Sequence, residues 1–211
     1  EVDRPKLTFR MVPRSELKRQ VLHVVDKHEG QAGIVYAMRR KDTESLAADL
    51  SKAGVRAAAY HAGLDSKKRT KIQQDFLSER IDVVVATIAF GMGIDRPDVR
   101  FVIHASLPKG IEQYAQETGR AGRDGLPSEC VMFYSGSDFH GWKSLMERGA
   151  EEAHEAGVAT AREELDNAVN RLSELWNFAT SANCRHRFLV EYFGGEFHAA
   201  EAGCGACDVC L

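Results

Sequence analysis

The sequence predicts an α/β fold, in which a parallel sheet carries helices on both faces and is followed by a small helical domain. Three observations lead to this fold. Short apolar runs alternate with helical patterns up to about residue 135, strand signals vanish from about Asp138 onward, and four of the five cysteines gather in the C-terminal part. Alternation of strands and helices is typical of parallel sheets that are covered on both sides. We therefore divide the chain into residues 1–137 and 138–211.

Five short apolar runs are the predicted strands of the sheet. The run at 82–86 is apolar on both faces, as a central parallel strand must be. Ligands of such sheets bind beyond the carboxyl ends of the strands. The candidate functional edge therefore consists of the loops that follow Met38, Tyr60, Ala86 and Ala105. The other predicted strands are 34–38, 56–60, 100–104 and 130–134.

Two helices are predicted between the early strands, because apolar residues recur there at spacings of three and four. The first helix is expected to be capped by Asp42 or Thr43 and stopped by Gly54. The second is expected to be capped near Ser66, with Phe76 turned toward the sheet. Both helices are of ordinary length for elements that cover a parallel sheet.

The second part of the chain is predicted to be helical. A long helix at 162–181 is indicated by apolar residues that share one face. The polar, alanine-rich stretch before it, at 147–160, is predicted to be a helix end and a linker. A shorter helix follows Cys184 and ends at Gly194-Gly195. Residues 196–211 are expected to form a loop.

The composition is that of an ordinary globular protein, with 211 residues of which 44% are hydrophobic and 28% charged. No apolar run approaches the length of a membrane span, so no membrane partner is expected. The net charge of −3 excludes a generic polycation, so nucleic-acid binding would need a local basic surface. The chain begins at Glu1 with neither an initiator Met nor a signal peptide, and we expect it to be cut from a longer protein.

Four cysteines form a candidate metal site, namely Cys184 and the series Cys204-x-x-Cys207-x-x-Cys210. Four thiolates satisfy tetrahedral Zn²⁺ and leave no open position, so a zinc ion here would be structural. The alternatives are an iron–sulfur cluster, whose motifs also contain Cys-x-x-Cys-x-x-Cys, and no metal at all. Zinc is favoured because the fourth cysteine lies upstream and no proline follows the last. Cys130 lies within a strand and is expected to be a buried apolar residue.

The most informative stretch runs from Gln116 to Gly125 and reads Gln-Glu-Thr-Gly-Arg-Ala-Gly-Arg-Asp-Gly. Its two arginines are three residues apart, and a planar guanidinium grips phosphate oxygens at two points. Arg-x-x-Arg alone is commonly a solvated loop, but the whole string resembles motif VI of superfamily 2 helicases, in the form found in the RecQ family. The resemblance implies that Arg123 is the principal arginine finger for ATP and Arg120 its partner. It also implies that Gln116 couples the nucleotide to the DNA edge.

A second stretch with a helicase-like pattern follows the strand at 82–86. It runs from Thr87 to Asp95, and its glycines expose backbone N–H groups that suit anions. On its own it is equally well a tight strand-to-helix turn. It resembles motif V of helicases, which implies that Thr87 touches the DNA backbone and that Gly93 and Asp95 face the nucleotide.

Basic residues follow two of the predicted strands. Taken alone, Lys67 and Arg69 have the pattern of a solvated helix face. The resemblance to RecQ helicases implies instead that His61, Lys67 and Arg69 lie along the edge that binds the DNA strand. It also assigns Arg39 and Arg40 to motif IV, where these helicases usually carry a small hydroxyl residue at the place of Arg39.

The resemblance to the RecQ family extends over essentially the whole chain. It implies that residues 1–137 are the second RecA-like domain of a 3′-to-5′ DNA helicase and that residues 138–211 are a RecQ zinc-binding domain. The sequence contains neither Gly-x-x-x-x-Gly-Lys-Ser/Thr nor Asp-Glu-x-His. ATP and Mg²⁺ would therefore be shared with a preceding RecA-like domain, and this chain alone would be inactive.

The implied partners are single-stranded DNA and duplex forks, bound by a monomer in the bacterial cytoplasm, on the nucleoid. Two other functions fit part of the sequence. A non-enzymatic, zinc-containing interaction module would give the arginine string no role. Another superfamily 2 motor, such as a DEAD-box RNA helicase, would leave the cysteine series unexplained.

Overall fold

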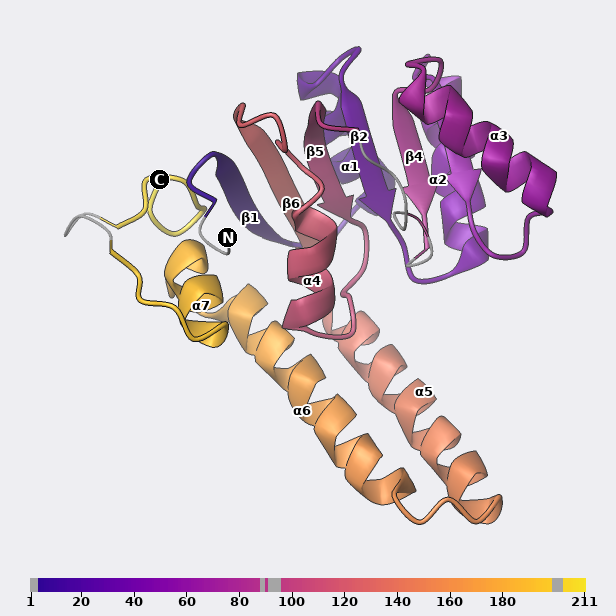
Figure 1. Cartoon of the computed structure of the whole chain (residues 1–211), viewed down its shortest axis with the longest axis vertical. Helices are drawn as coiled ribbons and strands as arrows, with labels where there is room; N and C mark the ends of the chain where they lie inside the picture. The colour runs from indigo at the N-terminus through magenta and orange to yellow at the C-terminus, as the bar shows by residue number, and fades with distance from the viewer. Residues whose placement is uncertain (1–3, 88–89, 91–95, 199–202) are drawn as a thin grey trace.

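The computed structural model of the chain describes residues 4–87, 90, 96–198 and 203–211. Within these residues, six parallel strands form one sheet in the order β1-β6-β5-β2-β4-β3 (Figure 1). The predicted parallel sheet is thereby confirmed, although the edge strand β1 had no counterpart among the predicted strands. The strands are β1 Leu7–Pro13, β2 Ala32–Tyr36, β3 Ala57–Tyr60, β4 Val83–Ala86, β5 Val99–His104 and β6 Ser128–Tyr134.

Helices cover both faces of the sheet, as predicted. One apolar core contains residues of α1 and α2, and the other contains residues of α3, α4, α6 and α7. Successive residues of a strand point to opposite faces, so Val83 and Val85 enter the first core while Val84 and Ala86 enter the second. The helices are α1 Leu17–Lys27, α2 Arg40–Lys52, α3 Ser66–Leu77, α4 Ile111–Thr118, α5 Gly136–Glu155, α6 Ala161–Thr180 and α7 Arg185–Tyr192.

The observed cap differs from the predicted one by three or four residues in α2 and by one residue in α3. Helix α2 begins at Arg40, and the Thr43 hydroxyl donates to the Arg40 carbonyl at 2.6 Å, so it caps no helix. The cap of α3 is Asp65, whose carboxylate accepts the backbone N–H of Lys68 at 2.8 Å. A carboxylate in extended backbone just before the helix can reach the free N–H groups of the first turn.

Residues 147–160 are not mainly a linker, because α5 continues to Glu155. Alanine and glutamate are strong helix formers, and the helix ends only at Ala156 and Gly157, where Gly157 has a φ of +86°. Helices α5 and α6 form an antiparallel pair that extends well beyond the sheet (Figure 1). The polar composition of this stretch reflects its solvent exposure and not an absence of helix.

The helical part shares its core with the sheet. Leu172, Leu175 and Phe178 of α6 are fully buried in the same apolar cluster as strands β1 and β5. The indole of Trp142 in α5 donates to the carbonyl of Leu107 at 2.7 Å. Residues 138–211 are therefore packed onto the sheet and have no core of their own among the described residues.

At the amino end of the sheet, a glycine makes room for an aromatic ring and an ion pair. The Phe101 ring lies so close to Gly33 that a Cβ there would be 2.0 Å from it. His28 stacks on Phe101 with ring centroids 5.1 Å apart, and its Nε2 lies 3.0 Å from Oε2 of Glu129. The hydrogen bond from His28 holds the pKa of Glu129 at about 2, and the same bond raises the pKa of His28.

We expect this pair to stabilise the fold most strongly between about pH 4.5 and 6.5, the ordinary pKa values of the two groups. The contribution of Glu129 is present above pH 4.5 and is lost as the pH falls toward about 2, because its folded pKa is depressed. The contribution of His28 is present below pH 6.5 and is lost as the pH rises through its raised folded pKa.

The variant His28→Gln should therefore lower the thermal midpoint more at pH 5.5 than at pH 8.5, as measured by circular dichroism. His23→Gln is the control, because His23 lies exposed on the same helix. An equal loss for His28→Gln at both pH values would contradict the ion pair.

Candidate functional site

The four predicted metal ligands meet in space. Cys184 is the N-cap of α7, and Cys204, Cys207 and Cys210 lie on the C-terminal loop. Their sulfur atoms all lie within 4.8 Å of one another. A tetrahedral Zn²⁺ with Zn–S bonds of about 2.3 Å requires sulfur atoms about 3.8 Å apart. The group therefore fits one zinc ion after a small contraction.

Two glycines allow the cysteine loop to close. Gly203 and Gly205 have φ values of +93° and +61°, which disfavour residues with a Cβ. A Cβ on Gly203 would also lie 2.7 Å from the sulfur of Cys210. The backbone N–H of Ala206 donates to the sulfur of Cys204 at 3.4 Å, a contact that favours a thiolate. The loop is thus shaped around its sulfur atoms.

The thiols have different proton affinities without a metal. Burial raises the pKa of the Cys204 thiol. Burial also acts to raise the pKa of Cys207, but hydrogen bonds from the backbone N–H groups of Arg185 and Val209, together with those from the neighbouring thiols, lower it overall. A divalent cation deprotonates coordinating thiols outright. Neither His186 nor His198 belongs to the sulfur group within the described residues.

The cysteine loop is tied to the first strand of the sheet. The N–H of Phe9 donates to the carbonyl of Ala206 at 3.1 Å, and the N–H of Asp208 donates to the carbonyl of Phe9 at 2.9 Å. The Asp208 carboxylate also accepts the N–H of Met11 at 3.0 Å and pairs with the buried Arg185 at 2.9 Å. The candidate metal site therefore joins β1, α7 and the C-terminal loop.

The predicted arginine string begins in the last turn of α4 and continues into the loop that leads to the amino end of β6. Gln116 and Arg123 are exposed, and Arg120 is half-buried. Arg4 donates to the carbonyls of Ala121 and Gly122 at 2.8 and 2.9 Å. Gly122 has a φ of +58°, and a Cβ there would lie 2.8 Å from the Leu126 carbonyl oxygen. Close packing and long-range hydrogen bonds thus fix the loop that carries both arginines.

Both arginines lie near the end of β2. Arg120 forms a side-chain hydrogen bond with the hydroxyl of Tyr36, the last residue of that strand. Burial raises the pKa of Tyr36, while the positive charges of Arg120 and Arg123 act in the opposite direction. The string therefore gathers positive charge beside the hydroxyl of Tyr36, on the face of the sheet that α4 covers.

A buried polar pair lies beneath the arginine loop and was not predicted. Nε2 of His104 is 2.7 Å from Oε2 of Glu117, and Gln113 donates to Oε1 of the same carboxylate at 3.0 Å. Only 1% of the His104 residue and 4% of Glu117 are exposed. The sequence did contain a signal for this pair. A histidine ends an apolar strand, and a glutamate follows it inside the arginine string.

The predicted DNA-contacting residues gather at the carboxyl ends of three neighbouring strands. Arg39 and Arg40 follow β2, Lys67 and Arg69 belong to the first turns of α3 after β3, and Thr87 directly follows β4. In the sheet these strands are adjacent, in the order β2-β4-β3. Residues up to 48 positions apart in the sequence are thus placed along one edge. Arg39 also lines a cavity of about 320 Å³ there.

His61 has a different environment from the other residues of this edge. Its ring is buried, its Nε2 lies 3.0 Å from a carboxylate oxygen of Glu44, and its Nδ1 accepts the N–H of Gly63 at 3.2 Å. Both ring nitrogens are thus engaged in contacts within the protein, and these contacts fix the turn before α3. Gly93 and Asp95, the predicted nucleotide-facing residues, lie outside the described residues.

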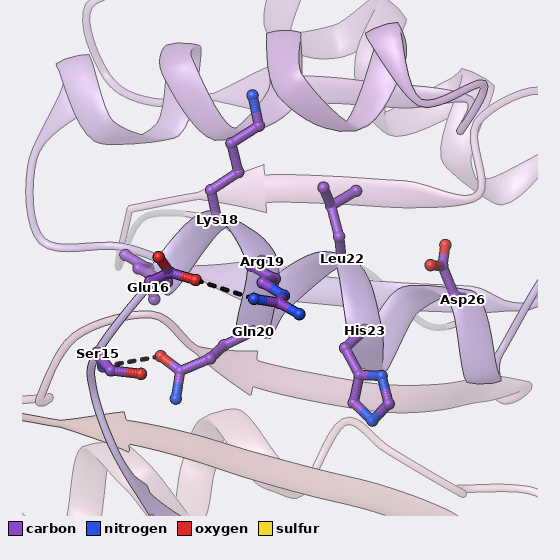
Figure 2. Close-up of a pocket in the computed structure, with 9 residues that line it drawn as sticks. Ser15, Glu16, Lys18, Arg19, Gln20, Leu22, His23 and Asp26 are labelled. Atoms are coloured by element: carbon purple, nitrogen blue, oxygen red, sulfur yellow. Dashed lines mark hydrogen bonds and ion pairs between the residues drawn. The ribbon is translucent and has the colours of Figure 1, made fainter.

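A further hollow, of about 900 Å³, lies along the first turns of α1 and was not predicted. Figure 2 shows charged side chains of both signs along it, with Glu16 and Arg19 paired at 3.4 Å. The backbone N–H of Ser15 donates to Gln20 at 3.0 Å. Because its charges are mixed and it is open to solvent, this hollow shows no arrangement typical of a catalytic or metal site. No described helix is both long and apolar enough to cross a membrane.

Substitution of one cysteine ligand should cause loss of the bound metal and local unfolding, because the free energy of metal binding at such a site is also folding free energy. We expect Cys207→Ala to lose stoichiometric zinc and to become sensitive to proteolysis after α7. Cys130→Ala is the control, because Cys130 is fully buried in β6 and lies outside the sulfur group. Elemental analysis and limited proteolysis decide the outcome. Stoichiometric iron, or a metal-free chain that resists proteolysis, would contradict a zinc site.

Two protein-family models match the chain. The model described as helicase conserved C-terminal domain matches residues 15–125, and the model described as RecQ zinc-binding matches residues 136–211. The first match ends with the arginine string, and the second contains all four clustered cysteines. Strand β6 lies between the two matches.

Known proteins agree with these matches. The chain is 40% identical to the ATP-dependent DNA helicase RecQ of Haemophilus influenzae and 42% identical to the RecQ-like DNA helicase blm-1 of Caenorhabditis elegans. These alignments cover 99% and 98% of this chain but only 32% and 20% of the relatives, so the chain spans a third of their length or less.

A solved structure supports the same fold. The Escherichia coli DEAD-box protein SrmB is 26% identical, with a TM-score of 0.53, over 61% of this chain and 76% of that one. The predicted RecA-like parallel sheet followed by a helical region is thus confirmed. The chain belongs to the helicase conserved C-terminal domain family, and within it to the RecQ helicases, whose zinc-binding region it also carries.

Proposed function

We propose that this chain supplies the arginine fingers and part of the DNA-binding edge of a helicase that couples ATP hydrolysis to 3′-to-5′ unwinding of DNA. The observation that carries the proposal is the fixed placement of Arg120 and Arg123 near the hydroxyl of Tyr36, the last residue of β2. Arg4 holds their loop through two backbone carbonyls that are more than a hundred positions away in the sequence. A loop held in this way presents its charges without reorganising when a ligand binds.

In this proposal, ATP binds between this domain and a second RecA-like domain that carries the phosphate-binding loop. Mg²⁺ bound with the nucleotide would neutralise part of the charge of its phosphates. Arg123, which is exposed, reaches the γ-phosphate and stabilises the negative charge that builds during transfer to water. Arg120 supports it from the half-buried side of the loop, and Gln116, Gly93 and Asp95 complete the nucleotide contacts.

The DNA contacts that we propose are contacts to the phosphate backbone. Arg39, Arg40, Lys67, Arg69 and Thr87 offer cationic and hydroxyl groups along one edge. Such contacts position a strand without specifying its sequence. His61 contributes by holding the turn that carries the lysine and arginine, since its own nitrogens are engaged within the protein.

We propose that zinc has a structural role and that residues 138–211 act as the zinc-binding domain on the motor domain of residues 1–137. The four sulfur atoms leave no position for a substrate. The five cysteines are free thiols, which suits a reducing compartment. We propose that this compartment is the bacterial cytoplasm and that the protein acts on the nucleoid. We propose that the protein acts as a monomer bound to single-stranded and forked DNA.

In the full-length helicase, Arg123→Ala should reduce ATP turnover by roughly 10³- to 10⁵-fold, the range that arginine fingers supply. Arg123→Lys should restore little, because a point charge cannot grip two oxygens. Phosphate release with single-stranded DNA present is the measurement, and Arg148→Ala, on the exposed face of α5, is the control. A turnover near that of the wild type in Arg123→Ala would reject this role.

The isolated chain should bind single-stranded DNA weakly and in a strongly salt-dependent manner. Each lost phosphate contact reduces the slope of log affinity against log salt by about one. Lys67→Ala should show that reduction, while Lys52→Ala should not, because Lys52 is exposed at the opposite end of the sheet. Fluorescence anisotropy of a labelled strand at several salt concentrations tests this. Equal slopes for both variants would remove Lys67 from the DNA edge.

A further inference from the structure

The hydroxyl of Tyr36 lies between two segments that the proposed function assigns to different ligands. It donates to the backbone carbonyl of Phe90 at 3.3 Å and accepts a hydrogen bond from Arg120. A phenol oxygen can donate one proton and accept others, so a single atom serves both segments. Within the described residues, Tyr36 thereby links the turn after β4 to the arginine loop after α4.

The ring of Tyr36 has little freedom to move. Only 4% of the residue is exposed, and the ring stacks on His104 with centroids 5.4 Å apart and planes 24° apart. His104 is itself fixed by its 2.7 Å contact with Glu117, which belongs to the helix that leads into the arginine loop. A displacement of the hydroxyl therefore requires movement of β2, β5 or α4.

The turn on the other side of Tyr36 is continuous with the DNA edge. Phe90 is buried, and its N–H donates to the carbonyl of Thr87 at 3.2 Å, while the N–H of Thr87 donates to the carbonyl of Tyr60. A shift of Thr87 on contact with a DNA phosphate would therefore move the Phe90 carbonyl. That carbonyl is the acceptor of the Tyr36 hydroxyl.

We propose that Tyr36 is a positioning residue through which a DNA contact at Thr87 adjusts the place of Arg120 beside the nucleotide. This inference rests on the proposed function, because it gives that function a route from DNA to ATP. The hydroxyl touches neither ligand and acts through the two groups that it joins. Loss of the hydroxyl should therefore weaken the coupling between the ligands more than the binding of either.

The test compares Tyr36→Phe with Tyr60→Phe in the full-length helicase. Tyr60 is a matched control, because it is 5% exposed, also contacts the Phe90 ring, and uses its hydroxyl only to accept a hydrogen bond from Gln73 among the described residues. ATP turnover is measured with and without single-stranded DNA, together with the KM for ATP and the Kd for DNA. Couplings of this kind span roughly two- to thirtyfold.

We expect Tyr36→Phe to lower the DNA stimulation of kcat by that factor with the KM and Kd unchanged, and Tyr60→Phe to retain full stimulation. Full stimulation in Tyr36→Phe would overturn the inference. So would a parallel loss of ATP and DNA affinity, because that result indicates only a structural role. A wild-type enzyme without DNA-stimulated turnover would instead reject the proposed function itself.

A double-mutant cycle provides a second measurement that does not depend on the stability of one variant. Arg120→Gln removes the charged partner on the nucleotide side of the same hydroxyl. If Tyr36 acts through Arg120, the double variant should lose no more DNA stimulation than the worse single variant. Additive losses would show two independent routes and would overturn the inference.

Discussion

Arg185 makes the interaction on which the C-terminal half of the molecule depends. Its guanidinium is buried, pairs with Asp208 at 2.9 Å, and donates to the backbone carbonyls of Phe178 and Ser181. One side chain thereby joins α6, the start of α7 and the cysteine loop. Removal of one partner from a buried pair of this kind costs about 3–5 kcal/mol, because the other charge is left uncompensated. The four clustered cysteines belong to two of the same segments, the start of α7 and the C-terminal loop.

An aromatic cluster connects these C-terminal segments with α4, the helix that leads into the arginine loop. Tyr114 of α4 contacts Phe9 of β1 and Phe178 of α6, with ring centroids 6.2 and 5.3 Å apart. It also lies 5.0 Å from the ring of His104. The helix before the arginines is thus packed between the sheet and the zinc-binding region. A division of function between residues 1–137 and 138–211 consequently has no matching division of the apolar core.

Local sequence patterns predicted what depends on local chemistry. The strand at 82–86 followed from its apolar residues, the four sulfur atoms from their spacing, and the position of the arginines from the glycines around them. The contacts that hold these parts together could not be predicted in the same way. Arg4 reaches the carbonyl of Ala121, and Asp208 reaches the N–H of Met11, across separations of 117 and 197 positions. No periodicity encodes such pairs, because they arise only when the sheet has formed.

The pairing of the cysteine loop with β1 has a consequence for the behaviour of the protein in concentrated solution. Strand β1 is at one edge of the sheet, and Ala206 and Asp208 occupy the backbone groups of Phe9 that face outward. An edge strand with free backbone groups is a template for pairing with another chain. By pairing with β1, the C-terminal loop therefore disfavours the pairing of this edge with another chain. A metal ion bound by the four cysteines would therefore favour solubility as well as the local fold, because the loop that it orders covers this edge.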